Sequence, residues 1–291
     1  MIDPAETWMA ERPRLINLAY RMLGSRADAE DVVQEAYIRM SAARWDEIED
    51  PAGWLVTVTS RLCIDQLRSA RARRELYPGP WLPEPVIDDL SDPADQITLD
   101  DSVRIALMLV LERLTPAERA AFVLHDVFQL PFERIAEIVG RTPQACRQLA
   151  SRARHRVASA PASRSDVSPG EALRVATGFA VACETGDLEA LTELLDPTVQ
   201  GLFDSGGHVP NAPNRVVTGA GRVAAILVDA FKGSGALFRP AGVNGGPGVV
   251  VKLGGAVVSV ISLDVAAGLI THVHGIGNPE KLRHLVDSDA P

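Results

Sequence analysis

Residues 130–157 read LPFERIAEIVGRTPQACRQLASRARHRV, and this stretch decides the fold of the middle of the chain. Its first part has apolar residues at the spacing of one helix face: Phe132, Ile135, Ala136 and Val139. Gly140 then supplies a sharp turn, and Thr142 followed by Pro143 is typical of the cap and first position of a second helix. The stretch therefore predicts a helix-turn-helix.

The second helix of this motif has one apolar side and one polar side. The apolar residues expected to face inward are Cys146, Leu149, Ala150, Ala153 and Val157. The residues then expected to point outward are Gln144, Arg147, Gln148, Ser151, Arg152 and His155. Such a helix fits the major groove of DNA, where Arg pairs well with guanine and Gln with adenine. We predict a DNA-reading helix; the alternative is a helical hairpin with a solvated basic face.

Residues 12–75 also have the 3.6-residue period of helices. Gly24 is the expected end of the first helix, and the second carries acidic residues in its first turn, where the helix dipole is positive. The third, within residues 54–74, is expected to turn Leu55 and Leu62 inward and Ser60 and Arg61 outward. Its terminal arginines are expected either to contact nucleic acid or to remain solvated.

The net charge of -9 is unfavourable for DNA binding, so the distribution of charge matters more than its sum. Residues 61–75 hold five arginines against two acidic residues, and residues 141–156 hold five arginines and no acidic residue. Between them, residues 84–101 hold seven acidic residues and no basic one. Residues 76–100 are rich in Pro and Asp and lack a helix or strand period. We therefore expect an extended acidic linker.

The chain has 291 residues, of which 46% are hydrophobic and 23% charged, and this length allows two or three ordinary globular domains. No apolar run reaches the roughly 18–20 residues that a membrane span requires, and the acidic N-terminus is unlike a signal peptide. Cys63, Cys146 and Cys183 lie far apart, without the spacing of a disulfide framework or a zinc site. We expect a cytoplasmic protein with no metal and no cofactor.

The composition changes after residue 170, where glycine and valine become frequent. Helices are expected over residues 170–196 and 219–232, and strands at four β-branched runs: 216–218, 249–253, 256–263 and 269–276. Helices followed by antiparallel strands indicate an α+β domain with a curved sheet.

Several residues of this last domain are of types suited to general acid–base chemistry: Asp204, His208, His272 and His274. Asp204, however, lies in a glycine-rich turn, where an aspartate more often binds backbone amides. His272 and His274 alternate on a predicted strand and so point to one face, which is either a cavity or solvent.

Three stretches occur in the order found in one family: ADAEDVVQEAYIRM (27–40), WLVTVTSRLCIDQLRSARARR (54–74) and LTPAERAAFVLHDVFQLPFERIAEIVGRTPQACRQLASRAR (114–154). They resemble the extracytoplasmic-function RNA polymerase sigma factors. Three short motifs resemble the subgroup with a SnoaL-like C-terminal extension: Trp81-Leu82-Pro83-Glu84-Pro85, Asp204-Ser205-Gly206-Gly207-His208 and Asn278-Pro279-Glu280-Lys281-Leu282. The second departs from the usual DGGG run at Ser205.

The resemblance implies a multidomain fold: two all-α sigma domains, the second a helix-turn-helix, followed by an α+β SnoaL-like (NTF2-like) cone. The implied bounds are residues 1–76 for polymerase binding and −10 recognition, 77–100 for an acidic linker, 101–160 for −35 recognition and 168–285 for a regulatory domain. The linker would lie in polymerase channels as a nucleic-acid mimic or serve as a solvated tether.

The resemblance also implies partners. RNA polymerase core enzyme, through the coiled coil of its largest subunit, would contact Asp28, Glu30, Asp31, Gln34 and Glu35. The −10 element of promoter DNA would contact Trp45, Arg61, Arg68 and Arg71, although tryptophans such as Trp45 and Trp54 in packed helices are more often core residues. The −35 element would contact the six outward residues of the second helix of the motif.

Regulatory contacts are implied for the three subgroup motifs: Trp81, Leu82, Pro83, Glu84, Pro85, Asp204, Asn278, Pro279, Glu280, Lys281 and Leu282. We expect a sigma factor, not an enzyme, that directs promoter-specific initiation and is modulated in cis by its last domain. Two alternatives stay open: a ligand-sensing helix-turn-helix regulator that acts without polymerase core, and a cyclase-like enzyme fused to a DNA-binding module. Whether the cone binds a small molecule also stays open, and no membrane partner is expected.

Overall fold

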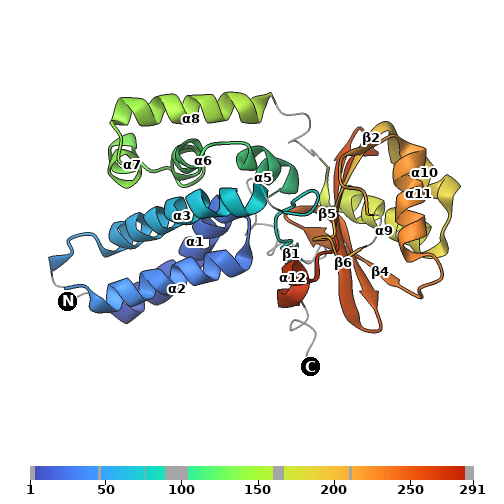
Figure 1. Cartoon of the computed structure of the whole chain (residues 1–291), viewed down its shortest axis with the longest axis horizontal. Helices are drawn as coiled ribbons and strands as arrows, with labels where there is room; N and C mark the ends of the chain where they lie inside the picture. Colours follow the sequence, from blue (N-terminus) through green and yellow to red (C-terminus); the bar gives the residue numbers. More distant parts are fainter. Residues whose placement is uncertain are drawn as a thin grey trace. The chain divides into compact units, whose positions relative to one another are not determined.

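The structure is a computed structural model that describes residues 4–44, 47–75, 77–88, 104–159, 167–209 and 212–285. The chain divides into two compact units: residues 1–76 with 110–160, and residues 77–109 with 161–291. The first unit is helical and the second contains the sheet (Figure 1). The segment expected to be a linker thus belongs, in its described part, to the C-terminal unit.

Three helices form the first half of the helical unit: α1 (Pro4–Leu23), α2 (Arg26–Ala42) and α3 (Pro51–Glu75). Gly24, with φ of 70°, donates its N–H to the Tyr20 carbonyl at 2.7 Å, which confirms the expected end of α1. The Ser25 hydroxyl then caps α2 by accepting from the Asp28 N–H at 3.0 Å. The three helices pack on one another through buried Leu18, Val33 and Leu55.

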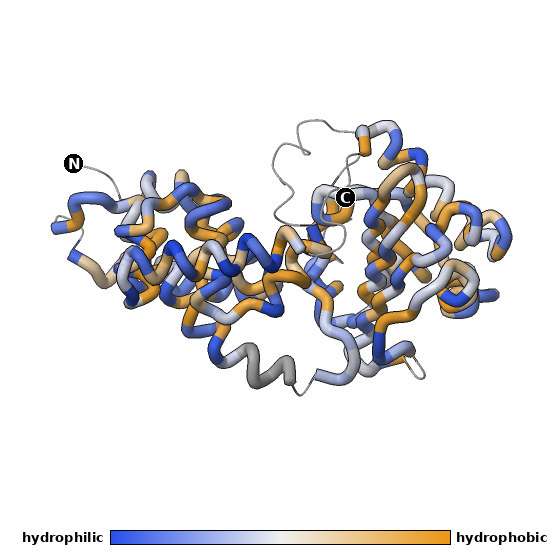
Figure 2. Tube along the Cα trace, turned by 90° about the horizontal axis from the view of Figure 1, so that it is seen from above, coloured by the Kyte–Doolittle hydropathy of each residue, from blue (hydrophilic) through white to orange (hydrophobic). Residues whose placement is uncertain are grey.

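The second half of this unit contains α6 (Pro116–Phe122), the π-helical turn η3 (Val123–Val127), α7 (Phe132–Val139) and α8 (Pro143–Ala158). Gly140 is left-handed, with φ of 69°, between α7 and α8. The Thr142 hydroxyl accepts from the Ala145 N–H at 3.2 Å. The predicted helix-turn-helix is confirmed with its turn and its cap. Figure 2 shows how hydrophobic and hydrophilic residues alternate along the helices of the helical unit.

Helix α3 is buried on more sides than its sequence predicts, because it contacts α6 and α7 as well as α1 and α2. Ser60, expected to point outward, is fully buried, as is its neighbour Thr59. That expectation is wrong, and the cause is a second packing surface that comes from residues far along the chain.

Arg119 of α6 is a fully buried cation within the helical unit. Its guanidinium donates to the Met22 carbonyl at 2.7 Å and to the Leu111 carbonyl at 2.9 Å. It also lies 2.6 Å from the Glu112 carboxylate. A buried charge is tolerated when it is paired and hydrogen-bonded, so this one residue ties the end of α1 to the end of α5 (Ile105–Glu112).

After the helix-turn-helix, the described residues of the C-terminal unit form the helices α9 (Pro169–Thr185), α10 (Leu188–Leu194), α11 (Ala220–Phe231) and α12 (Pro279–Leu282), and the 3-10 turn η4 (Arg283–Leu285). Its strands are β1 (Ile87–Asp88), β2 (Leu195–Asp204), β3 (Val217–Thr218), β4 (Leu237–Val243), β5 (Gly246–Leu253), β6 (Ala256–Ala266) and β7 (Leu269–Ile276). They form one sheet in the order β1-β4-β5-β6-β7-β2-β3.

The α+β class of this unit is confirmed, but the sheet is mixed. The β2 and β7 strands run parallel, whereas the other neighbouring pairs are antiparallel. The expectation of antiparallel strands is wrong for this pair, which can be parallel because four strands and a helix separate its members in the chain.

The sheet has a core on each face. One core, beneath α9, α10 and α11, includes Phe179, Val223 and Val273. The other, on the opposite face, brings Leu82 and Ile105 of the 77–109 segment against Val243, Val260, Ile276, Leu282 and Leu285. The 77–109 segment therefore supplies part of a hydrophobic core to the C-terminal unit.

Among the described residues, no helix combines the length and the apolar character that crossing a membrane requires. Cys63, Cys146 and Cys183 are free and buried.

We predict that Arg119→Met lowers the free energy of unfolding of the helical unit by about 3–5 kcal/mol, because it leaves partly buried Glu112 and two carbonyls without their cation. Urea unfolding followed by circular dichroism measures this loss. Arg113→Met is the matched control, since Arg113 is exposed in the same chain region. Equal stability of the two variants would contradict the role given to Arg119.

Candidate functional site

Residues 77–88, called the strap from here on, lie along the C-terminal unit in extended form. The WLPEP motif is its centre: residues 82–85 are buried and Trp81 is half-buried. Two prolines restrict the backbone on either side of Glu84, which lowers the entropy lost when the strap is held. The WLPEP motif, to which the resemblance assigned a regulatory role, is thus part of the C-terminal unit.

The C-terminal end of the strap extends the sheet. Its strand β1 pairs antiparallel with β4, and so covers what would otherwise be an open edge. The Asn244 side chain accepts from the Val86 N–H at 3.0 Å, and the Asn244 N–H donates to the Val86 carbonyl at 2.8 Å. Asn244 has φ of 52°, a conformation that asparagine tolerates better than most residues. Close by, the His284 ring bonds the Pro85 carbonyl at 3.0 Å.

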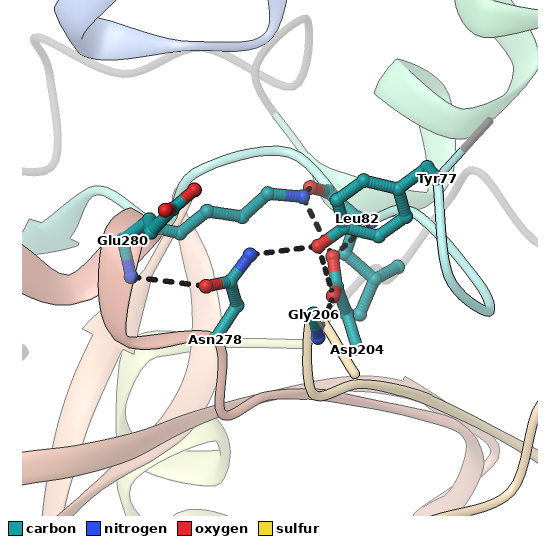
Figure 3. A network of polar contacts seen from close by, with 7 residues as sticks. Tyr77, Leu82, Asp204, Gly206, Asn278 and Glu280 are labelled. Carbon is teal, nitrogen blue, oxygen red and sulfur yellow. Dashed lines mark hydrogen bonds and ion pairs between the residues drawn. The ribbon is translucent and has the colours of Figure 1, made fainter. Parts of the chain in front are cut away.

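Asp204, at the end of β2, holds the other end of the strap (Figure 3). Its Oδ1 accepts from the Tyr77 hydroxyl at 2.6 Å and from the Gly206 N–H at 3.0 Å. Its Oδ2 accepts from the Leu82 N–H at 2.8 Å and from Lys281 Nζ at 2.6 Å. The carboxylate is 1% exposed, so these four donors replace the water that it has lost.

The NPEKL motif presents the cation of this network. Asn278 caps α12 by accepting from the Glu280 N–H at 2.9 Å, and its amide donates to the Tyr77 hydroxyl at 2.7 Å. The short helix directs Lys281 onto the strap, where Nζ also donates to the Leu82 carbonyl. Nζ lies 4.3 Å from the Trp81 ring centre and 4.9 Å from that of Tyr77, within cation–π range.

We call Tyr77, Leu82, Asp204, Gly206, Asn278 and Lys281 the Asp204 network. Burial and the bond to Asp204 raise the pKa of Tyr77 far above its usual range, so its hydroxyl stays a donor at any physiological pH. The network satisfies a buried acid and a buried base with each other and with strap backbone. It can therefore hold the strap, and it depends on both charges.

Two glycines let the turn after β2 approach its neighbours, the cap of α12 and the strap. Gly206 has φ of +60°, and a Cβ there would lie 2.6 Å from the Asn278 amide. Gly207 has φ of +79°, and its Cβ would lie 3.1 Å from Pro78. Ser205, by contrast, does not have a positive φ. The departure of this sequence from a DGGG run therefore falls at the position that does not require glycine.

The predicted −35 residues form one exposed face of α8: Gln144, Arg147, Gln148, Ser151, Arg152 and His155 are all exposed. Arg147 pairs with Glu133 of α7 at 2.9 Å. Arg154 and Arg156 instead pair with Asp126 and Glu118 at 3.1 and 3.0 Å, which ties α8 to its own domain. The basic residues of this helix are thus divided between an outward face and internal ion pairs.

The predicted −10 residues lie partly outside what the structure describes. Trp45 is outside the described residues, and Arg71 lies in α3 with a side chain that is not described. Arg61 and Arg68 are exposed. Arg61 donates to the Glu137 carbonyl at 2.9 Å, and Arg68 pairs with Asp65 at 3.2 Å.

The predicted polymerase-binding residues lie along α2. Glu30, Asp31 and Gln34 are exposed, and Glu35 is half-buried. Glu30 and Glu35 pair with Arg26 and Arg39 one turn away, at 3.1 and 2.9 Å. Asp28 accepts from the Gln66 amide at 2.8 Å and so joins α2 to α3. The partner of Asp28 thus lies on a neighbouring helix, whereas the partners of Glu30 and Glu35 lie within α2.

Of the residues considered for acid–base catalysis, only His272 and His274 lie together. Asp204 belongs to its network and His208 is exposed in the following turn. His272 and His274 face Asp264 of β6, with Nδ1 to Oδ2 distances of 3.9 and 3.8 Å. These distances are too long for hydrogen bonds. Asp264 Oδ2 and His274 Nδ1 have no hydrogen-bond partner among the described residues.

Burial changes the charge state of this cluster. It raises the pKa of Asp264 to about 7, against a smaller lowering by Arg104, and lowers the pKa of His274 to about 3. Burial also lowers the pKa of His272. A neutral carboxylic acid at Asp264 beside a neutral imidazole at His274 is therefore the favoured state just below neutral pH.

Sequence reasoning missed Tyr77 and Asn244, because neither lies in a motif and each acts through contacts far away in the chain. It named Asn278 and Lys281 only through resemblance, and it assigned a regulatory role to Asp204 in the same way. The one local signal was the short aspartate–glycine turn, which indicated backbone bonding by Asp204.

The chain matches two family models: Sigma-70 region 2 over residues 7–73 and Sigma-70, region 4 over residues 104–157. It is 41% identical over 283 residues to the probable ECF RNA polymerase sigma factor SigI of Mycobacterium tuberculosis, which covers 96% of this chain and 95% of SigI. It is 45% identical over 225 residues to the ECF RNA polymerase sigma factor SigJ of the same species, over 75% of this chain and 70% of SigJ. The crystal structure of M. tuberculosis SigJ superimposes with a TM-score of 0.73 at 36% identity, covering 97% of this chain and 98% of that one.

We predict that Asp204→Asn speeds amide hydrogen exchange at Leu82 by about 10- to 100-fold, since a hydrogen bond to a charged group contributes about 1.5–3 kcal/mol. Exchange in the intact chain, resolved by NMR or mass spectrometry, measures the change. Asp196→Asn is the matched control, because Asp196 lies on the same strand and its carboxylate accepts bonds from Thr198 in its own local turn. Unaltered exchange at Leu82 in the Asp204 variant would show that the strap is held by other contacts.

We also predict opposite pH slopes for two variants of the histidine cluster. A raised carboxyl pKa stabilises the fold below pH 4, and this stabilisation is lost as the pH rises to about 7. A lowered histidine pKa stabilises the fold above pH 6.5, and this is lost as the pH falls to about 3. The two effects oppose each other in the wild type between pH 4 and 6.5.

Relative to wild type, Asp264→Asn should therefore make stability rise more steeply with pH in this window, and His274→Gln should make it fall. Each slope is at most about 1.4 kcal/mol per pH unit. Urea unfolding at several pH values measures both. Slopes of the same sign in the two variants would contradict the assignment.

Proposed function

Because this chain belongs to the extracytoplasmic-function RNA polymerase sigma factors, we propose that it binds RNA polymerase core enzyme and directs promoter-specific initiation. We propose further that its C-terminal domain restrains this activity in cis by holding the strap. The observation that carries this second part is the Asp204 network, in which a buried acid and a buried base converge on the strap.

The proposed −35 interface is the exposed face of α8. Its first turn carries Gln144 and Arg147, whose side chains can pair with adenine and guanine edges in a major groove. Arg152 and His155 lie further along the helix, where phosphates would be within reach. The absence of acidic residues in α8 supports this use, since phosphate contacts dominate affinity.

The proposed polymerase and −10 interfaces lie on α2 and α3. The exposed acidic face of α2 suits a basic partner, and the family relationship points to the coiled coil of the largest polymerase subunit. Arg61, Arg68 and Arg71, with Trp45, are proposed to bind the opened −10 strand. In the free chain Arg61 bonds the Glu137 carbonyl, so this contact would have to break when DNA is bound.

The proposed restraint follows from where the strap lies in the sequence. It directly follows α3 and precedes α5, so it belongs to the connection between the two proposed DNA-reading domains. A sigma factor that contacts two promoter elements needs this connection to follow the polymerase surface. A strap held by the C-terminal domain is not available for that path.

We propose that the chain carries out no covalent chemistry and acts in the cytoplasm, where the polymerase is. The Asp204 carboxylate is engaged by its own network, and His272 and His274 lie in a different cluster with Asp264, which supports the first statement. The three free cysteines support the second, because reduced thiols are typical of that compartment.

We predict that the chain co-purifies with core enzyme and supports run-off transcription on genomic DNA fragments. Arg147→Ala and Arg152→Ala should each lower promoter-dependent transcript by about 5- to 150-fold, equal to 1–3 kcal/mol per lost contact. Arg113→Ala is the control, since Arg113 is exposed but lies outside α8. Failure of the folded chain to associate with core enzyme at modest ionic strength would overturn the proposed function.

A further inference from the structure

A cavity of about 360 Å³ lies within the C-terminal unit, between α11 and the sheet. Its helix wall is formed by Ile226, Leu227 and Phe231, and its sheet wall by Phe203 and Ile261. The volume lies within the range of small-molecule sites in proteins, and such sites are usually apolar with a few polar groups. The cavity is separate from the His272–His274 cluster, which contributes none of its lining residues.

The floor of the cavity is shaped by two glycines beneath an aromatic ring. A Cβ at Gly275 would lie 2.7 Å from the Phe203 ring, and a Cβ at Gly201 would lie 2.8 Å from it. Since real Cβ atoms do not approach so closely, only glycine at these positions lets the ring lie down on the sheet. The half-buried ring then presents an apolar surface to the cavity.

The polar groups of the cavity are few, and none of its described lining residues is basic. The Ser259 hydroxyl donates to the Ile276 carbonyl at 3.2 Å, which leaves its oxygen able to accept a bond. Asp229 is exposed and carries negative charge on the lining helix. An anion would be repelled here, and a cation would lose its hydration to an apolar wall.

We propose that this cavity binds a neutral, mainly apolar small molecule with a hydrogen-bonding group, and that its occupancy strengthens the hold on the strap. The coupling rests on the proposed function; the binding itself does not. The cavity wall includes Asp204, Ser205 and Gly277. These residues also form the back of the Asp204 network, because the Gly277 N–H donates to the Asp204 carbonyl at 2.8 Å and Asn278 follows directly.

The direction of the coupling follows from linkage. A ligand that packs on the ends of β2 and β7 binds best when those ends are ordered as they are here, and so it stabilises that arrangement. The same arrangement places the Asp204 carboxylate against the Leu82 N–H. Ligand binding should therefore slow the opening of this hydrogen bond, and loss of the bond should weaken ligand binding.

The binding test uses two fluorescent probes with one ring system. N-phenyl-1-naphthylamine is neutral, and 8-anilinonaphthalene-1-sulfonate adds a negative charge. We expect the neutral probe to bind the intact chain and Ala230→Trp to weaken it at least about tenfold, since Ala230 is an exposed lining residue whose enlargement fills the cavity. The control Arg222→Trp places the same side chain on an exposed position of α11 outside the cavity.

Three results would overturn the site: no binding of the neutral probe, equal binding by the Ala230 variant, or tighter binding of the sulfonate. Circular dichroism establishes that both variants fold. None of these measurements contains polymerase or DNA, so their failure is distinct from failure of the proposed function.

The coupling test measures amide exchange at Leu82 with the neutral probe at saturation. We expect slower exchange in the wild-type chain and no probe effect in Asp204→Asn, whose own affinity for the probe should fall. Unchanged exchange at Leu82 with the probe demonstrably bound would overturn the coupling.

Discussion

The charge of Asp204 is the constraint on which the C-terminal unit depends. A carboxylate that is 1% exposed must be supplied with donors, and here they come from four places in the chain: Tyr77, Leu82, Gly206 and Lys281. Lys281 is buried in turn and has the same requirement for an anion. Neither charge is tolerated alone, because breaking a buried pair typically costs about 3–5 kcal/mol. The strap is therefore held by a polar network whose members depend on one another, rather than by apolar contacts alone.

This dependence gives the C-terminal domain a means of control that a plain hydrophobic contact would not offer. Apolar burial of Leu82 and strand pairing by β1 would keep the strap in place under most conditions. A charged network can instead be biased by small shifts of the turn that carries Asp204. A ligand in the cavity behind that turn would shift the turn and so change how firmly the strap is held. Given the family, the strap is part of the connection between two proposed DNA-reading domains.

Arg119 plays a comparable role inside the helical unit, where one buried cation joins three chain segments.

Local features of the sequence predicted local structure well. The helix-turn-helix follows from Gly140, Thr142 and Pro143 together with an apolar period. Each of these three residues determines the backbone conformation or capping of residues next to it in the sequence. The α+β class followed from β-branched runs punctuated by glycine. The strands β1, β2 and β4 were not predicted: the LDPTVQGLFD run of β2 has no clear alternation, and the two-residue β1 exists only because β4 offers an edge. Ser60 was placed outward because the α6 and α7 surface that covers it lies more than fifty residues away.

The site likewise divides into residues that the sequence indicated and residues that only the fold brings together. Resemblance named Asp204 and Lys281 as regulatory, yet Tyr77, which bonds both Asp204 and Asn278, follows from no pattern and needed the fold.

The most direct test of the central claim is the amount of run-off transcript that core enzyme makes with Lys281→Met, compared with wild type. The control is Lys232→Met, because Lys232 is exposed at the C-terminal end of α11. Core binding is measured in parallel so that transcript is compared at equal occupancy. If the strap is a restraint, loss of its buried cation should raise promoter-dependent transcript several-fold while the control stays at the wild-type level. An unchanged or lower amount from a folded, core-bound Lys281 variant would contradict the account.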